Sequence, residues 1–207
     1  TACASPAAAL LRLNPAGTMF LAEGVYTGAA DAVLTLDRAL TLSGGWNAAF
    51  ADRVGLSTLD GQDARPVLLL VAGADVTAER LMLEHGLGGV RIDAGALTLR
   101  RSAVRLNRSE ADGGGIANLG GTLYLEAVTL SGNDAARGAG LFNAGTAVIV
   151  NSTLGGNVAT ADGGGLANTG QARLNNVTVK DNTAASGGGL AALDGELTLS
   201  NTLLADN

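Results

Sequence analysis

A repeat of about 25 residues fills the second half of the sequence and limits what this chain can fold into. Each copy opens on a glycine-rich stretch followed by an aliphatic residue, continues through a run such as Leu-Thr-Leu, and closes on asparagine. The opening glycines lie 25, 25, 25 and 24 residues apart. They are Gly88, Gly113, Gly138, Gly163 and Gly187. A fixed period of this length is typical of solenoids, in which each unit packs only against its neighbours.

Apolar and polar residues alternate over very short runs within each copy. Leu97-Thr98-Leu99 and Val177-Thr178-Val179 are examples, and Gly or Asn bounds the runs. This period of two predicts three short β-strands in each copy. One copy cannot bury its own inward side chains, whereas stacked copies can, at a strand spacing of about 4.8 Å. The sequence therefore predicts an all-β fold, a right-handed parallel β-helix with rungs of about 25 residues.

Recurrent asparagines are predicted to stack in ladders along this β-helix. Asn tolerates the left-handed backbone at corners, and its side-chain amide can hydrogen-bond to the same amide one rung away. The closing column comprises Asn107, Asn133, Asn157, Asn182 and Asn207. A second column comprises Asn118, Asn143 and Asn168, and a partial third comprises Asn151, Asn176 and Asn201.

Glycine supplies 31 of the 207 residues, whereas aromatic residues make up only 3% and charged residues 15%. In a narrow solenoid, glycine allows positive φ and leaves room where the chain turns sharply. Because most of the later glycines fall at fixed places in the repeat, this composition predicts rigid corners and not a flexible polymer.

The whole chain is expected to form one β-helix domain. A short helix is predicted near the start, with Ser5 as its N-cap and Pro6 as its first residue, capping the N-terminal end of the stack. The expected divisions are this cap in residues 1–17, irregular rungs in 18–87 with a loop around 45–58, and regular repeats in 88–207.

The charge and cysteine content exclude several classes of partner. Thirteen Lys and Arg against nineteen Asp and Glu give a net charge of −6, so no basic field would attract nucleic acid. One cysteine, Cys3, and one histidine are too few for a structural zinc site, and no metal or cofactor is expected. Cys3 is expected to be an idle thiol or to form an intermolecular disulfide. Every apolar run is shorter than the roughly 20 residues of a membrane-spanning helix, so no such segment is expected.

Charged residues alternate in sign on successive copies. The position before the glycine stretch is Asp112, then Arg137, then Asp162. Two further columns pair Arg100 with Glu126 and Arg108 with Asp134. Opposite charges on neighbouring rungs are expected to form solvated cross-strand pairs. The alternative is that Asp112, Arg137 and Asp162 form a binding face for a sugar or a cation.

His85 is the only histidine, so a Ser-His-Asp triad would require it. It lies where a rung is expected to turn, which favours a structural role. The segment Asp60-Gly61-Gln62-Asp63 carries two carboxylates, but its glycine between two strands indicates a turn. We therefore expect no catalytic residues in this chain.

Several segments resemble the right-handed β-helix repeats of bacterial surface proteins, in particular the polymorphic outer-membrane-protein type. The resemblance rests on GGGI or GGGL followed by a short turn, an LTL run and a terminal xxN, and in the first half on FLAEGVYTG and LSGGWNAAF. It implies a secreted or cell-surface protein of bacterial origin. It implies little about activity, because the shared residues are structural.

These patterns favour a non-enzymatic structural or adhesive protein. The last copy closes at Asn207, and a bare rung presents unpaired backbone groups. We therefore expect self-association through the rung ends, with an end-to-end filament as one outcome. The alternative is a β-helix that binds or degrades polysaccharide as a lyase or hydrolase, with a cell-surface glycan as partner.

Overall fold

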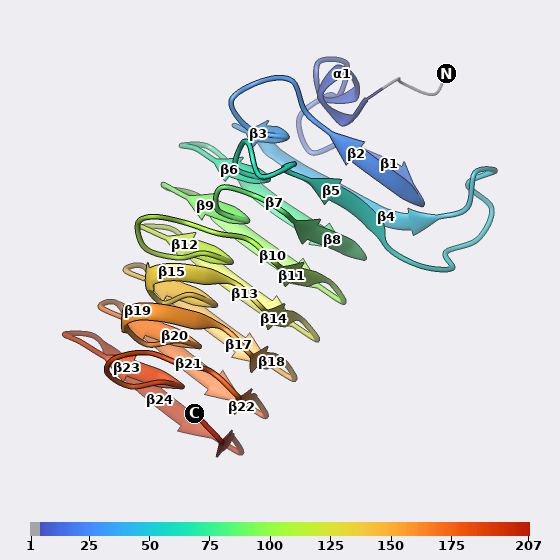
Figure 1. Cartoon of the computed structure of the whole chain (residues 1–207). Coiled ribbons are helices and arrows are strands. Elements are labelled where there is room, and N and C mark those ends of the chain that lie inside the picture. Colours follow the sequence, from blue (N-terminus) through green and yellow to red (C-terminus); the bar gives the residue numbers. More distant parts are fainter. Residues whose placement is uncertain (1–4) are drawn as a thin grey trace.

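The chain forms a solenoid of parallel β-sheets in a computed structural model that describes residues 5–207 (Figure 1). Two eight-stranded sheets and one seven-stranded sheet run along its length. Sheet A contains β1 (Thr18–Ala22), β4 (Ala39–Trp46), β7 (Asp75–Glu79), β10 (Ala96–Arg100), β13 (Thr122–Glu126), β17 (Thr146–Val150), β21 (Gln171–Asn175) and β24 (Glu196–Ser200). Sheet B contains β2 (Gly24–Thr27), β5 (Ser57–Asp60), β8 (Leu81–Glu84), β11 (Ala103–Arg105), β14 (Thr129–Ser131), β18 (Thr153–Gly155), β22 (Thr178–Lys180) and β25 (Leu203–Ala205). Sheet C contains β3 (Leu34–Leu36), β6 (Leu68–Leu70), β9 (Val90–Ile92), β12 (Ile116–Asn118), β16 (Leu141–Asn143), β20 (Leu166–Asn168) and β23 (Leu190–Ala192).

The aliphatic residues of the repeat stack in register inside this solenoid. One column on sheet A is Leu99, Leu125, Ile149, Leu174 and Leu199, each the register partner of the next. The alternation of buried and exposed residues along β13 and β17 shows why the sequence has a period of two. The predicted all-β parallel β-helix with rungs of about 25 residues is therefore confirmed.

Residues with left-handed backbone mark the corners. One column is the first glycine of each triplet, Gly113, Gly138, Gly163 and Gly187. A second, between sheets A and B, is Arg101, Ala127, Asn151, Asn176 and Asn201. The third is Leu106, Gly132, Gly156, Asp181 and Asp206, each immediately before a closing asparagine. The expectation that all ladder asparagines occupy left-handed corners is thus wrong, because only those of the partial third column do so.

The later glycines of each triplet are required by the closeness of the next rung. A Cβ on Gly140 would lie 2.5 Å from the carbonyl oxygen of Gly165, and a Cβ on Gly165 would lie 2.5 Å from that of Gly189. Any side chain here would separate the rungs. The glycine excess therefore encodes close rung stacking as well as turns.

The closing asparagines form the predicted ladder, and their side chains are buried until the last rung. Asn157 donates from Nδ2 to Oδ1 of Asn182 at 2.9 Å and to the carbonyl oxygen of Leu130 at 3.0 Å. Its own Oδ1 accepts from the backbone N–H and from Nδ2 of Asn133, at 3.1 and 2.9 Å. The same Nδ2-to-Oδ1 contact links every successive pair from Asn107 to Asn207.

The second column is also a ladder, from Asn118 to Asn143 at 2.8 Å and from Asn143 to Asn168 at 2.7 Å. It ends at sheet C of the last rung, where Ala192 is the register partner of Asn168. The partial third column is only partly connected. Asn176 donates to Asn151 at 2.7 Å, but Asn201 donates to Asn175.

The first rung is covered by α1 (Pro6–Leu10), the short helix expected in residues 1–17. Its N-cap is Ser5, whose Oγ accepts from the backbone N–H of Ala8 at 3.2 Å. Ala9 and Leu10 pack against the core.

Within residues 5–207, no helix is long and apolar enough to cross a membrane. Cys3 lies outside the described residues.

The loop expected around residues 45–58 corresponds to an excursion between β4 and β5. β4 continues through Trp46 and β5 begins at Ser57, so only residues 47–56 leave the rung. Buried Ser57 lies at its end: its Oγ accepts from the Gly45 backbone N–H at 2.9 Å and contacts the carbonyl oxygens of Leu21 and Ala22, at 2.9 and 2.7 Å. These bonds hold the two ends of the excursion against β1.

A small fourth sheet, of β15 (Asp134–Arg137) and β19 (Val158–Asp162), lies between the closing asparagine and the next glycine triplet. Ala135, Ala139 and Ala159 form a separate small core beneath it. These strands have no alternating apolar pattern that would predict them, because their only apolar residues are alanines and one valine.

We expect Asn157→Ala to lower the free energy of unfolding by more than ~2 kcal/mol, because it leaves two donors of Asn133 without their buried acceptor. Urea unfolding followed by circular dichroism measures the loss. Asn151→Gly is the matched control, since it removes an exposed amide and keeps the left-handed backbone; its effect should stay below ~0.5 kcal/mol. Equal losses in both variants would contradict a special role for the buried ladder.

Candidate functional site

The column Asp112, Arg137 and Asp162 lies together on one flank, as the repeat predicted. Arg137 and Asp162 are register partners on β15 and β19. The Arg137 guanidinium donates to both oxygens of Asp112, at 2.9 Å from Nε and 2.6 Å from Nη2, and lies 5.2 Å from the ring centre of Phe142. The Asp112 hydrogen bonds and charge, with the more distant charge of Asp162, raise the pKa of Arg137. The Asp112 carboxylate therefore already occupies two donors of the Arg137 guanidinium. Binding of a sugar or a cation on this face stays a prediction.

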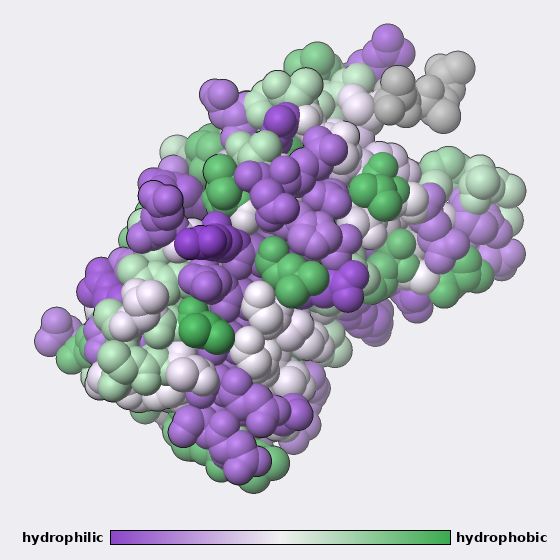
Figure 2. All heavy atoms as spheres, in the orientation of Figure 1, coloured by the Kyte–Doolittle hydropathy of each residue, from purple (hydrophilic) through white to green (hydrophobic). Residues whose placement is uncertain are grey.

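The other two charged columns differ in whether the predicted ion pair is present. Arg100 donates to Glu126 at 2.9 Å and lies 5.9 Å from the Tyr124 ring centre, so the predicted cross-rung pair is present. Arg108 and Asp134 are partners in register, but they are not among the ion pairs found within residues 5–207. Figure 2 shows hydrophilic and hydrophobic residues interspersed over the surface in view, without one dominant patch.

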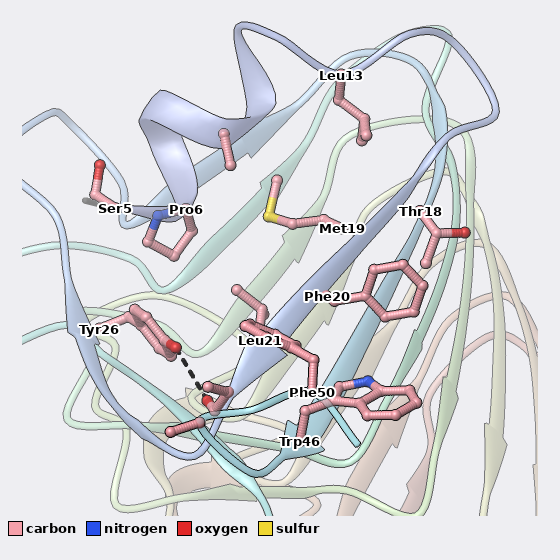
Figure 3. Close-up of a pocket in the computed structure, with 13 residues that line it drawn as sticks. Ser5, Pro6, Leu13, Thr18, Met19, Phe20, Leu21, Tyr26, Trp46 and Phe50 are labelled. Atoms are coloured by element: carbon pink, nitrogen blue, oxygen red, sulfur yellow. Dashed lines mark hydrogen bonds between the residues drawn. The ribbon is translucent and has the colours of Figure 1, made fainter. Parts of the chain in front are cut away.

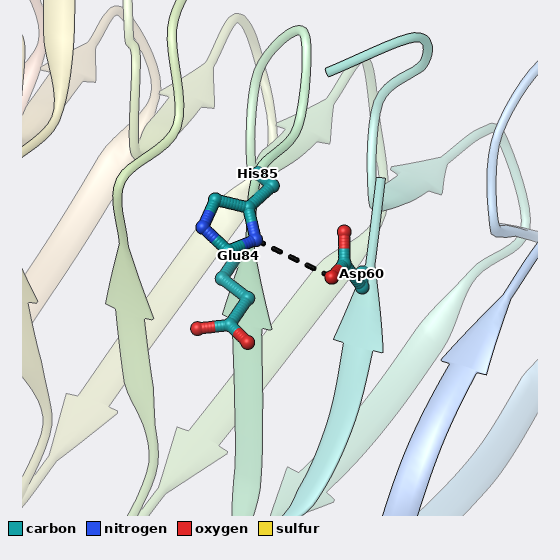
Figure 4. Close-up of side chains that lie close together, drawn as sticks. All are labelled: Asp60, Glu84 and His85. Atoms are coloured by element: carbon teal, nitrogen blue, oxygen red, sulfur yellow. Dashed lines mark hydrogen bonds and ion pairs between the residues drawn. The ribbon is translucent and has the colours of Figure 1, made fainter. Parts of the chain in front are cut away.

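A cluster of titratable groups surrounds His85 (Figure 4). Asp60 and Glu84 end adjacent strands and are register partners, and the His85 ring nitrogen Nδ1 lies 3.3 Å from Asp60 Oδ2. These three residues each offer a metal-ligand atom within 4.8 Å of the others. Arg105 donates to Glu84 at 2.8 Å from the next rung. Arg105 and His85 thus supply partners for both carboxylates, and in Figure 4 the Glu84 carboxylate is directed away from Asp60.

The N-terminal end contains a pocket that the sequence analysis missed (Figure 3). Its volume is about 850 Å³, and no lining side chain among the described residues carries a formal charge. The lining comprises Ser5, Pro6, Ala9, Leu13, Thr18, Met19, Phe20, Leu21, Ala22, Tyr26, Trp46, Ala48 and Phe50. Four of the chain's six aromatic residues are among them. Their separation in sequence, from Phe20 to Phe50, hides the cluster until the rung closes.

Tyr26 contributes the pocket's one titratable group. Its hydroxyl donates to the carbonyl oxygen of Ala22 at 3.0 Å. Burial raises the pKa of Tyr26, so the side chain stays neutral at physiological pH. The pocket therefore suits an uncharged group.

The opposite end of the solenoid is open. Leu199 and Leu204 occupy inward positions on β24 and β25, yet they are 42% and 50% exposed. Their register partners one rung earlier, Leu174 and Val179, are 1% and 0% exposed. No described residue covers this last layer of core side chains.

Comparison with protein-family models, curated proteins and solved structures finds no match to this chain. The class that its own geometry defines is a parallel β-solenoid with internal asparagine ladders.

A double-mutant cycle of Asp112→Ala and Arg137→Ala should give a coupling energy of about 0.2–1 kcal/mol, since the pair is partly exposed. Unfolding in urea at low and high salt measures it, and added salt should reduce the coupling. The same cycle on Arg100 and Glu126 is the comparison pair. A coupling above 3 kcal/mol, of the order found for buried pairs, would contradict the assignment as a solvated cross-strand pair.

Proposed function

We propose that this chain is a non-enzymatic structural or adhesive element of a secreted or cell-surface bacterial protein, which associates through the open rung of β23, β24 and β25. The resemblance of its repeats to bacterial surface β-helices supports the setting. The observation that carries the association is the exposure of Leu199 and Leu204 at positions that are buried on preceding rungs.

The backbone and the ladder at this rung support the same proposal. β23, β24 and β25 are terminal strands of their sheets, each paired on one side only. Asn207 accepts from Asn182 and donates to the carbonyl oxygen of Val179, but the donor that earlier ladder members direct to the next rung has no partner among the described residues. A covering layer would thus bury leucines, pair strand edges and extend the ladder together.

The two ends are not equivalent. At the other end α1 packs over the first rung through Ala9 and Leu10, whereas no described helix lies on β24 or β25. A head-to-tail filament requires α1 to share or leave its position on the first rung. Pairing of two open ends leaves α1 undisturbed and closes as a dimer.

Sedimentation velocity of the purified chain should show concentration-dependent association. Leu199→Lys combined with Leu204→Lys should abolish it, because two charges would enter the apolar contact. Leu106→Lys, a change at an exposed leucine on the flank, is the matched control and should associate like the wild type. A wild type that stays monomeric at high concentration contradicts the proposal, and electron microscopy distinguishes filaments from dimers.

Assays for reducing ends and unsaturated products on acidic and neutral polysaccharides should show no turnover. Reproducible turnover that is lost in Asp112→Asn or Asp162→Asn would favour the polysaccharide-degrading alternative. Binding without turnover on a glycan array, lost in Arg137→Ala, would favour a carbohydrate-binding role for that face.

A further inference from the structure

The free edge of β1 runs through the aromatic pocket at the N-terminal end. β1 is the first strand of sheet A and, within residues 5–207, pairs only with β4. All five of its residues, Thr18–Ala22, line the pocket. An edge strand presents unpaired N–H and C=O groups along its outer side. The floor of this pocket therefore includes backbone donors and acceptors, and at its end the carbonyl oxygen of Ala22 already accepts from the hydroxyls of Tyr26 and Ser57.

The walls on the two sides of this edge are both apolar. On the inner side, Met19 and Leu21 point toward the core beneath α1, where Pro6, Ala9 and Leu13 complete the lining. On the outer side Phe20 is 53% exposed and packs edge-to-face on Trp46, with ring centres 5.4 Å apart. Figure 3 shows Met19 directed toward α1 and Phe20 directed toward the opposite wall.

The outer wall is built by the excursion of residues 47–56. Phe50 lies on this loop with left-handed backbone and remains 42% exposed beside Trp46. Arg53 lies 5.4 Å from the Trp46 ring centre and pairs with Glu79, so its charge is satisfied outside the lining. The wall thus offers aromatic surface without a free charge.

We propose that this pocket binds an extended, uncharged peptide segment, which adds to β1 as a further strand of sheet A. Side chains of an added strand point alternately to the two faces of the sheet. Here one set would enter the inner wall beneath α1 and the other would contact Phe20, Trp46 and Phe50. Main-chain hydrogen bonds to the edge supply affinity, and the apolar walls select a segment with apolar side chains on both faces. This inference does not depend on the proposed association through the opposite end.

A compact apolar molecule fits these observations less well. It would fill one wall and leave the backbone groups of the β1 edge without partners, which is costly once water is excluded. A peptide satisfies the edge and both walls together. The pocket volume of about 850 Å³ lies within the range of about 300–1,000 Å³ for ligand sites.

The test uses the full chain and a blocked peptide with the sequence of residues 145–151, Gly-Thr-Ala-Val-Ile-Val-Asn. This segment contains β17, a strand of sheet A that carries apolar side chains on both faces and no charge. Trp46 is the only tryptophan, so its fluorescence reports on the pocket directly. We expect a saturable fluorescence change and slower hydrogen exchange over residues 18–22. A peptide with proline in place of Ile149 should bind at least tenfold more weakly, because in sheet A the N–H of this residue is directed to the following rung and would bond to β1.

Phe50→Asn should weaken peptide binding by about tenfold, because it removes an aromatic wall while Asn still accepts the left-handed backbone. Val25→Ser, at an exposed β2 residue outside the lining, is the matched control and should bind like the wild type. Equal binding of the proline peptide, or binding of the neutral probe N-phenyl-1-naphthylamine in its place with no change in exchange over residues 18–22, would overturn strand addition. Self-association that alters Trp46 fluorescence and blocks the peptide would instead identify a second copy as the occupant.

Discussion

Each buried amide in this solenoid depends on a partner one rung away. The closing asparagines of the interior rungs are at most 1% exposed, as in Asn133, Asn157 and Asn182. Their amide donors and acceptors bond to neighbouring rungs. A register slip of one residue would place these amides against positions that carry no side-chain amide and leave several polar groups unpaired in the core. The ladder therefore fixes register, whereas the aliphatic columns supply the hydrophobic stabilisation that any register with the same alternation would share.

At the two ends of the stack, a rung has a neighbouring rung on one side only. At the first rung α1 and the aromatic residues take the place of a preceding layer, and at the last rung Leu199 and Leu204 have none. In the interior rungs the buried amides pair internally, and Asp112 with Arg137 and Arg100 with Glu126 form cross-rung ion pairs.

Much of the fold was predictable from the sequence, because a repeat shows the register directly. Asn118, Asn143 and Asn168 share one position of the period, and so they had to lie on one line once the copies stacked. The repeat position likewise predicted that Arg137 lies between Asp112 and Asp162. Features without a period were not predictable: β5 depends on the buried hydroxyl of Ser57, which binds β1 across 36 positions of sequence.

The candidate sites divide in the same way. The aromatic pocket brings together residues from α1, β1, β2 and β4 that share no repeat position, and the contact of His85 with Asp60 depends on the left-handed turn at His85. No pattern in a single sequence predicts either arrangement, apart from the low number of aromatic residues. That scarcity was informative, since a chain with six aromatic residues places four of them at one end.

The two asparagine ladders also give the rod an electrical direction. Between Asn107 and Asn207, and again between Asn118 and Asn168, each bond from one asparagine to the next runs from Nδ2 to the Oδ1 of the higher-numbered rung. The second Nδ2 hydrogen of each closing asparagine is donated to a carbonyl oxygen of the preceding rung. The amide dipoles in each ladder are therefore aligned along the stack, and aligned hydrogen bonds polarise one another. As in the macrodipole of a helix, such alignment leaves partial charge at the ends. Among the described residues, the donor end of the closing ladder thus lies at Nδ2 of Asn207.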